Sequence, residues 1–318
     1  MGLSDNLIAF HDSTTGTITY LLMDPSSKKA ASRLTVEGRR SIPLSSSSCS
    51  PPFPPAVIDP VLGYDAVSGR TDEGTVQVVL DKVAELGLAV VATVETHAHA
   101  DHISAAPIVK RAHPAAKAVI GAHIADVQKI FAPIFNLTEE EVRGGAANFD
   151  CFLNEGDVLE VGGIKLSVMH TPGHTPACVS YYSQDLGVVF CGDTLFMPDA
   201  GSARCDFPGG SSHTLWQSVQ KLLALPEETV IATCHDYGKG GARDYAWLST
   251  VKEQKEANIH VKSGTVEDEF IQWRSERDAT LSLPKLIVPS IQCNIRAGQF
   301  PTAESNGQVY LKTPVNKL

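Results

Sequence analysis

The feature that most constrains this chain is a cluster of three histidines and one aspartate within six residues, directly after a strongly apolar run. The cluster is His97-Ala-His99-Ala-Asp101-His102, and residues 88–94 before it are apolar almost throughout, as in a strand that is buried on both faces. Imidazole nitrogens and carboxylate oxygens are ligands of zinc and of non-haem iron. Because a hydrophobic core has no use for so many polar rings, the cluster predicts a metal site at the end of a buried strand.

Three later segments repeat this arrangement, since in each an apolar, strand-like run is followed by a side chain that can bind a metal. The residues that follow the three runs are His174, Asp193 and His235. A single histidine after a strand is more often a hydrogen-bonded polar residue than a ligand, but four such segments in one chain reverse those odds. Because the loops that follow strands gather at one edge of a sheet, we expect these side chains to meet there.

Hydrophobic periodicity predicts alternating strands and helices, and therefore the α/β class. Residues 76–86 have helical spacing, and Gly87 is well placed to end that helix. Thr138 and Glu141 have the spacing of a capping box. Further helices are expected near 124–131, 215–223 and 266–277, and strands near 17–23, 56–58, 164–169, 179–182, 187–191 and 230–233.

One segment stands apart in composition. Residues 28–55 include four consecutive serines and four closely spaced prolines, which bury too little apolar surface to form a core. The segment lies between two strand-like runs and therefore indicates an exposed insertion into a hairpin. No other change in composition divides the chain, so we expect one domain over residues 1–318, with this insertion and a C-terminal extension at about 245–318.

The charge balance argues against several classes of partner. Twenty-six Lys and Arg against 36 Asp and Glu give a net charge of −10, which disfavours nucleic acid and anionic membrane surfaces. No apolar run approaches the roughly 18 residues that span a bilayer. The N-terminus resembles neither a secretory signal nor an Arg-rich transit peptide. Because the seven cysteines are scattered and form no C-x-x-C pair, we expect reduced thiols in an intracellular, cytoplasmic protein, with a mitochondrial location as the alternative.

The order and spacing of the metal-binding motifs over about residues 90–240 resemble the metallo-β-lactamase superfamily. The segments that carry the resemblance are His97-x-His99-x-Asp101-His102, Pro172-Gly-His174-Thr, Gly192-Asp193-Thr and His235-Asp236-Tyr237. The resemblance implies a four-layer αββα sandwich, with the metal site at one edge between two mixed sheets.

Within that superfamily the chain more closely resembles the persulfide dioxygenases of the ethylmalonic encephalopathy protein type, in their bacterial branch. The segments concerned are Glu95–Pro107, Thr171–Cys178, Gly192–Asp199, Ala203–Gly210, Pro289–Gly298 and Tyr310–Leu318. This resemblance implies an enzyme that uses one Fe(II) and O₂ to convert glutathione persulfide into sulfite and glutathione. We also expect a homodimer.

The resemblance assigns roles to individual residues. His97, His174 and Asp193 would hold the iron and leave three coordination positions open for substrate and O₂. Tyr237, His235 and Asp101 would act in catalysis, with Tyr237 near the substrate. The residues that would orient ligands and water, or hold a second metal, are His99, Asp101, His102 and His235.

Substrate recognition is expected to depend on arginines, because glutathione carries two carboxylates and a guanidinium group binds a carboxylate through two hydrogen bonds. Arg204 and Arg296 lie in the matching segments and are the candidates, and Asn294 would add polar contacts. The alternative for Arg204 is a structural ion pair, for instance with Asp206, and a structural pairing is the alternative for Arg296 as well.

Other functions remain open at this stage. A hydrolase with two zinc ions, such as a glyoxalase II-like thioesterase or a lactonase, would use the same ligand types. The segments Asp236-Tyr237-Gly238 and Asn294-x-Arg296 favour the dioxygenase. A more specialised persulfide in place of glutathione persulfide is a third possibility. A non-enzymatic scaffold protein that has lost its metal site is disfavoured, because every expected metal-binding residue is present.

Overall fold

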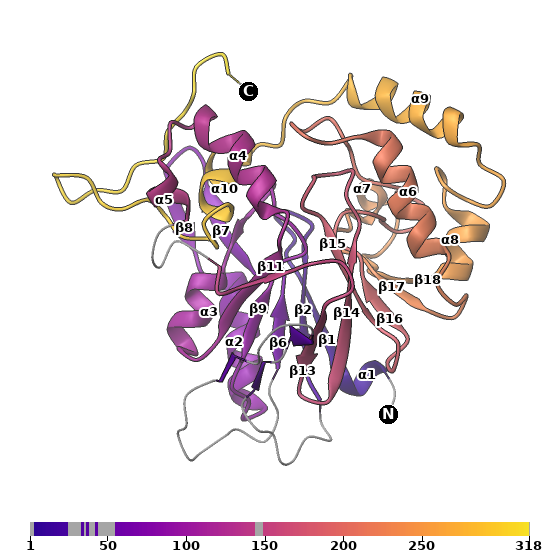
Figure 1. Cartoon of the computed structure of the whole chain (residues 1–318), viewed down its shortest axis with the longest axis horizontal. Coiled ribbons are helices and arrows are strands. Elements are labelled where there is room, and N and C mark those ends of the chain that lie inside the picture. The colour runs from indigo at the N-terminus through magenta and orange to yellow at the C-terminus, as the bar shows by residue number, and fades with distance from the viewer. Residues whose placement is uncertain are drawn as a thin grey trace.

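Two facing sheets lie between two layers of helices in the computed structural model, which describes residues 3–24, 33–34, 36–37, 42–43, 55–143 and 149–317 (Figure 1). The first sheet has neighbours in the order β1 (Leu7–His11), β2 (Ile18–Leu22), β6 (Ala56–Ile58), β9 (Ala92–Val94), β11 (Lys117–Gly121) and β12 (Cys151–Leu153). Strands β6, β9, β11 and β12 run parallel, and β1 and β2 are antiparallel. The sheet is therefore mixed, as expected.

The second sheet is also mixed. Its neighbours are β18 (Leu248–Thr250), β17 (Val230–Ala232), β16 (Val188–Phe190), β15 (Val179–Ser183), β14 (Ile164–His170), β13 (Val158–Val161) and β4 (Val36–Glu37). Only β16 and β17 pair in parallel. Two smaller sheets join β10 (Ile103–Ser104), β7 (Val61–Asp65) and β8 (Arg70–Asp72), and β3 (Arg33–Leu34) and β5 (Ile42–Pro43).

The core between the two sheets follows from strand alternation. Successive side chains of a strand point to opposite faces, so every second residue of β2 and of β16 reaches the inner layer. Tyr20 and Leu22 pack there against Val188 and Phe190, whereas Leu21 faces the other way. The two sheets therefore share one apolar core, with their second faces left for helices.

Helices cover the outer faces of both sheets and complete the αββα arrangement (Figure 1). On the first sheet, α2 (Gly74–Glu85) and α3 (Ala106–Ala112) bury their apolar stripes against Leu21 and Val57. On the second sheet, α6 (Ser212–Leu223), α8 (Val251–Ala257) and α9 (Glu267–Asp278) pack in one cluster with Val189 and Ile231. The remaining helices are α1 (Leu3–Asn6), α4 (Ile124–Ile134), α5 (Glu139–Arg143), α7 (Gly238–Gly241) and α10 (Ile287–Asn294).

Most expected elements are present. The helix expected at 76–86 is α2, and Gly87 follows it with φ +64°. The capping box forms, because the Thr138 N–H donates to Glu141 Oε2 and the Glu141 N–H donates to Thr138 Oγ1. The expected strand at 88–94 is shorter, since only Ala92–Val94 pair in the sheet. Sequence periodicity missed β1, β7, β8, β10–β13 and β18, and also the two-residue strands β3–β5 within the expected insertion.

The expected insertion falls mostly outside the described residues. It does interrupt a hairpin, because β2 and β6 pair antiparallel with Tyr20 opposite Ile58. Of residues 28–55, the described pairs include β4, which adds to the edge of the second sheet beside β13. Val36 and Glu37 therefore form a strand, and the exposure expected for the insertion stays a prediction. The division into one domain with a C-terminal extension stays a prediction.

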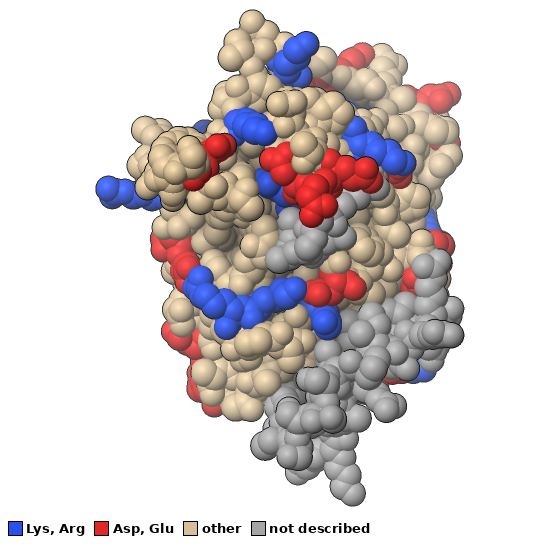
Figure 2. All heavy atoms as spheres, turned by 60° about the vertical axis from the view of Figure 1, so that its left-hand side comes forward, with Lys and Arg blue, Asp and Glu red and all other residues tan. Residues whose placement is uncertain are grey.

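Charged side chains are mixed in sign on the face that comes forward in Figure 2. Acidic and basic groups are interspersed there among uncharged residues, and the described part of that face carries no broad basic surface. Among the described helices, none is both long and apolar enough to cross a lipid bilayer.

Two buried tyrosines tie each sheet to the loop that leaves the other. Tyr20 of the first sheet donates its hydroxyl to the carbonyl oxygen of Thr233, 2.7 Å away, just after β17. Tyr181 of the second sheet donates to the carbonyl oxygen of Glu95, 2.9 Å away, just after β9. The two hydrogen bonds cross the core in opposite directions and fix the relative position of the two strand ends.

We predict that replacing Tyr20 or Tyr181 with Phe lowers the free energy of unfolding by about 1–3 kcal/mol, because a buried carbonyl loses its donor while the ring still fills its space. Urea denaturation followed by circular dichroism measures the effect. Tyr310→Phe is the matched control, because its hydroxyl lies in an exposed hydrogen bond with Asn306. Equal stability of all three variants and the original protein would contradict the role given to the two buried hydroxyls.

Candidate metal centre

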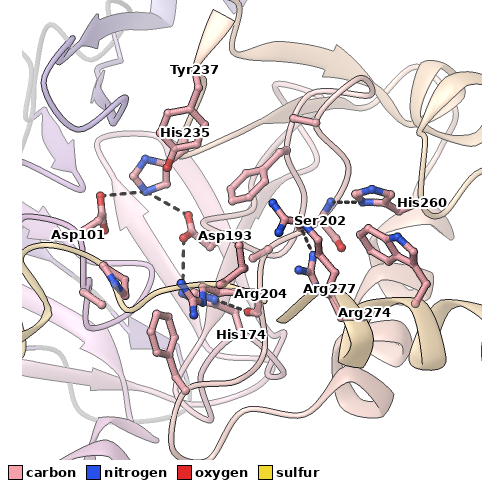
Figure 3. A pocket seen from close by; sticks show the side chains of 18 residues that line it. Asp101, His174, Asp193, Ser202, Arg204, His235, Tyr237, His260, Arg274 and Arg277 are labelled. Atoms are coloured by element: carbon pink, nitrogen blue, oxygen red, sulfur yellow. Dashed lines mark hydrogen bonds and ion pairs between the residues drawn. The ribbon is translucent and has the colours of Figure 1, made fainter. Parts of the chain in front are cut away.

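The expected metal-binding residues meet at one edge of the sandwich, where several strands end. His97, His99, Asp101 and His102 follow β9, and the other three, His174, Asp193 and His235, follow β14, β16 and β17. Figure 3 shows Asp101, His174, Asp193 and His235 converging on one side of a cavity. The structure therefore brings together all seven residues that the sequence singled out, from four separate segments that follow strands of the two sheets.

Asp193 lies at the centre of this cluster. Its Oδ2 atom is 3.8 Å from His97 Nε2 and 3.5 Å from His174 Nε2. The three residues are buried, and their ligand atoms lie within 4.8 Å of one another. Two imidazoles and one carboxylate at this spacing can hold a single metal ion.

The second oxygen of Asp193 faces a different group of side chains. Asp193 Oδ1 is 3.4 Å from His235 Nε2, which is also 3.4 Å from Asp101 Oδ2. The His102 ring lies 6.4 Å from the His235 ring and 4.2 Å from the His99 ring, measured between centroids. The carboxylate of Asp193 thus stands between two sets of nitrogen and oxygen donors.

Buried polar atoms that lack a hydrogen-bond partner show whether these residues fit a metal. Buried polar atoms are nearly always hydrogen-bonded, because leaving one unpaired costs free energy. In the cluster, five buried ligand atoms have no hydrogen-bond partner among the described residues: His97 Nε2, His99 Nδ1, His102 Nε2, His235 Nε2 and Asp193 Oδ1. A bound divalent ion would satisfy them, and mixed nitrogen and oxygen donors suit Fe(II) or Zn²⁺. The residues fit a metal, and their number provides donors for one ion or two.

Hydrogen bonds on the far side of each ring fix which nitrogen faces the centre. His174 Nδ1 lies 2.7 Å from the carbonyl oxygen of Arg204, so Nδ1 carries the proton and Nε2 is free. Thr17 Oγ1 lies 3.3 Å from His102 Nδ1 and 3.4 Å from His235 Nδ1. One hydroxyl therefore orients two rings. Nothing in the sequence marked Thr17 for this role.

Asp59 is the other supporting residue that sequence reasoning missed. It follows β6 with φ +49°, an uncommon conformation for a residue with a side chain. Its Oδ1 accepts from the Thr96 N–H at 2.8 Å and lies 3.0 Å from His99 Nε2. Because that contact takes His99 Nε2, Nδ1 is the atom of His99 left for a metal. The sequence did hold a signal, since Asp59 follows a strand as the ligands do.

Protonation differs between two neighbouring rings. Burial holds the pKa of His97 well below its usual range, so this ring is neutral and can bind a metal. Burial also acts against the charged form of His99, but the adjacent carboxylates of Asp59 and Glu95 outweigh it and hold the His99 pKa well above its usual range. The two carboxylates therefore favour the protonated form of His99, whereas His97 is neutral.

Gly192 allows the two strand ends to approach each other. It has φ +52°, and a Cβ atom there would lie 2.7 Å from Thr96 Oγ1. That hydroxyl donates to Asp59 Oδ2 at 2.9 Å and lies 3.0 Å from His97 Nδ1. A side chain at position 192 would therefore displace the groups that orient His97.

Two of the expected substrate contacts lie behind the histidine cluster. Asn294 is buried and donates from Nδ2 to the carbonyl oxygens of His99 and His102, at 2.8 and 2.7 Å. It holds the backbone of the histidine cluster and does not line the cavity. Arg296 is also buried, donates from Nε to the carbonyl oxygen of Gln292, and does not line the cavity either. Asn294 is the last residue of α10 and Arg296 follows it, and both support the site from behind.

Arg204 and Tyr237 do border the cavity. Arg204 makes a two-pronged ion pair with Asp206, with both N···O distances 2.6 Å. This is the structural ion pair that was the alternative to a substrate contact for Arg204. It also donates to the carbonyl oxygen of Ser282. The Tyr237 ring is half-exposed at the rim and lies parallel to the His235 ring, with centroids 5.9 Å apart.

The cavity beside the cluster has a volume of about 460 Å³. Its wall includes residues to which the sequence analysis assigned no role, several of them from α9 and the segments flanking it. These additional lining residues are Ala100, Phe196, Ala200, Ser202, Ala203, Phe207, His260, Trp273, Arg274, Arg277, Leu281 and Pro284. The cavity is large enough for a small organic substrate whose reactive end lies at the metal-binding cluster.

Comparison with known proteins identifies related chains. The sequence pattern of the Metallo-beta-lactamase superfamily matches residues 55–235. A probable metallo-hydrolase of Burkholderia pseudomallei is 40% identical over 317 residues, covering 97% of this chain and 98% of that protein. Glyoxylase B2 of Dictyostelium discoideum is 45% identical over 263 residues, covering 83% and 89%.

A protein named as a persulfide dioxygenase and a structure of ETHE1 are similar to this chain at lower identity. The mitochondrial persulfide dioxygenase of Homo sapiens is 30% identical over 223 residues, covering 70% of this chain and 75% of that protein. The crystal structure of ETHE1 from Myxococcus xanthus superposes with a TM-score of 0.66 at 27% identity, covering 92% of this chain and 99% of that one.

We predict that His174→Ala lowers the bound metal by at least tenfold, because the variant lacks one of the three donors around Asp193 Oδ2. Elemental analysis by inductively coupled plasma mass spectrometry gives the metal content per chain. His213→Ala, which removes an exposed histidine of α6, is the matched control. Full metal content in His174→Ala would show that the ion binds elsewhere.

We predict that Asp59→Asn weakens metal binding by about 10- to 100-fold, since it disturbs the partners that orient His97 and His99 without removing a ligand. Competition with a chromophoric chelator measures the affinity. Asp81→Asn, an exposed carboxylate of α2, should leave the affinity unchanged. An unchanged affinity in Asp59→Asn would remove the positioning role of this residue.

Proposed function

The chain belongs to the metallo-β-lactamase superfamily, and within it we propose that the protein is an iron-dependent persulfide dioxygenase, which converts glutathione persulfide and O₂ into sulfite and glutathione. The observation that carries the proposal is the group formed by His97, His174 and Asp193 beside the cavity. Two histidines and one carboxylate on one side of an ion are typical of non-haem Fe(II) oxygenases, which need open coordination positions.

Relatives support this proposal and also name its main rival. The human persulfide dioxygenase and ETHE1 from Myxococcus xanthus align over most of this chain. The relatives of higher identity carry the names of a hydrolase and a glyoxylase. Membership of the superfamily therefore supports a metal-dependent enzyme, and the dioxygenase activity is the finer proposal.

Fe(II) bound by the three ligands would supply the redox chemistry with O₂. The chain itself supplies binding. Asp101 and His235 border the cavity 3.4 Å apart and are polar groups placed to contact a persulfide that lies beside the metal-binding residues. Burial acts against ionisation of Asp101, but the charges of His235 and His102 outweigh it and hold the Asp101 pKa well below its usual range. Asp101 is thus an anion at neutral pH.

Tyr237 and two phenylalanines shape the space around the substrate. Phe196 and Phe207 form apolar wall beside the metal-binding residues, with ring centroids 6.1 Å from His235 and 5.2 Å from His174 respectively. This wall excludes water from the reacting sulfur. Tyr237 at the rim can donate a hydrogen bond to the bound substrate, because burial and the charges of Asp101 and Asp193 raise the pKa of its hydroxyl.

Cysteine chemistry is disfavoured in this cavity. No cysteine is among its lining residues. Burial raises the pKa of Cys178, Cys191 and Cys205 to about 12, so these thiols are protonated at neutral pH. A persulfide sulfur entering the cavity would therefore be its sole reactive sulfur.

A hydrolase with two metal ions is the second candidate, and a specific observation favours it. His102 Nε2, His235 Nε2 and Asp193 Oδ1 have no hydrogen-bond partner among the described residues and could hold a second ion next to the first. Two such ions would activate a water molecule for attack on a carbonyl group. Ligand types alone do not separate the two candidates, so the test compares both reactions on the same protein.

The test measures sulfite formation and O₂ uptake with glutathione persulfide, and in parallel the hydrolysis of S-lactoylglutathione. We expect the iron-loaded protein to consume O₂ and form sulfite in equal amounts, and to hydrolyse the thioester slowly or not at all. His174→Ala serves as the inactive control. Rapid thioester hydrolysis without sulfite formation, in iron-loaded and zinc-loaded protein, would replace the dioxygenase with the hydrolase.

A further inference from the structure

The end of the cavity away from the metal-binding residues carries an uncompensated positive charge. We propose that Arg277, in the last turn of α9, binds a carboxylate at the far end of the substrate and so selects persulfides that carry such a group. The inference rests on the proposed function and adds a specificity-determining residue that lies outside the sequence motifs. It also moves carboxylate recognition away from Arg296, which the structure does not place in the cavity.

Three arginines line the cavity, but two of them are already paired. Arg204 forms its two-pronged ion pair with Asp206. Arg274 is buried, is ion-paired with Asp278 of the same helix, and donates to the carbonyl oxygen of Ser202 at 3.3 Å. Each of these guanidinium groups therefore has a carboxylate of its own, and a substrate carboxylate would compete with it.

Arg277 differs from both. Its Nη1 donates to the hydroxyl of Thr280 at 2.9 Å, and in the described part of the chain no carboxylate lies within 4.0 Å of its guanidinium group. Asp206 and Asp278 thus offset two of the three guanidinium charges, and that of Arg277 remains. A guanidinium group with free N–H donors at a cavity wall matches a carboxylate through two parallel hydrogen bonds.

Neighbouring groups add no further charge at this end. Burial, helped by the charges of Arg274 and Arg277, lowers the pKa of His260 to about 4, so its ring is neutral at pH 7. The ring lies against Trp273, with centroids 3.7 Å apart. His260 and Trp273 therefore add an uncharged aromatic wall at this end of the cavity, and the unpaired positive charge there belongs to Arg277.

The layout gives the substrate a direction. Figure 3 shows Asp101, His174, Asp193 and His235 on one side of the cavity, and Arg274, Arg277 and His260 on the other. A substrate whose sulfur lies at the metal-binding residues must extend its other end toward α9. An anion is favoured at that end by the charge of Arg277, whereas the carboxylates of Asp101 and Asp193 disfavour it near the metal end.

Steady-state kinetics of Arg277→Gln test the proposal. We expect KM for glutathione persulfide to rise about tenfold with kcat changed less than twofold, because the carboxylate lies far from the reacting sulfur and is bound alike in the ground and transition states. Arg277→Lys keeps the charge and should recover part of the loss. Lys285→Gln is the matched control, because it removes an exposed positive charge after α9 and Lys285 itself does not line the cavity.

A persulfide without a carboxylate, prepared from 2-mercaptoethanol, completes the comparison. Its KM should be the same for the original protein and Arg277→Gln. Equal rises of KM for both persulfides would overturn the proposal, since they would show that Arg277 supports the shape of the cavity and binds no carboxylate.

Binding of glutathione itself gives a readout independent of turnover. Because Trp273 lines the cavity, tryptophan fluorescence can follow the titration, and we expect Kd to be about tenfold higher in Arg277→Gln. An unchanged Kd would overturn the proposal. Absence of sulfite formation by the original protein would instead contradict the proposed function, so the two failures are distinguishable.

Discussion

The structure depends on burying a set of metal-binding atoms, without hydrogen-bond partners, at the edge where the two sheets meet. His97 Nε2, His102 Nε2, His235 Nε2 and Asp193 Oδ1 are buried without hydrogen-bond partners, an arrangement that costs free energy unless a cation compensates it. The surrounding fold makes that arrangement possible by fixing the opposite side of each ring. Thr17 does so for two rings, and backbone carbonyls and hydroxyls do so for the others.

The two sheets contribute to this edge in a reciprocal way. Asp59 and the histidine cluster leave the first sheet, whereas His174, Asp193 and His235 leave the second. Tyr20 and Tyr181 each donate a hydrogen bond across the core to the loop of the opposite sheet, close to His235 and His97. A shift of one sheet against the other would therefore move half of the ligands relative to the rest. The packing of the shared core therefore also fixes the geometry of the metal centre.

The sequence predicted the metal centre better than the substrate end, for a physical reason. Ligands follow strands, and strand periodicity places them at a common edge, so the seven metal-binding positions could be predicted. Asp59 follows the same rule and could have been added. The far wall of the cavity comes from α9, whose many charges resemble an ordinary solvated helix, so nothing local marked Arg277. The sequence could not show that Asn294 and Arg296 donate to backbone carbonyls behind the cavity, because a motif records proximity to the site but not the direction of a side chain.

The most direct measurement is an anaerobic titration of metal-free protein with Fe(II), with the initial rate of sulfite formation from glutathione persulfide recorded at each step. The account predicts that the rate rises linearly and reaches its plateau at one equivalent of iron per chain, as expected for the single site of His97, His174 and Asp193. A plateau at two equivalents, or activity restored by Zn²⁺ toward a thioester with no sulfite formed at any iron content, would contradict it.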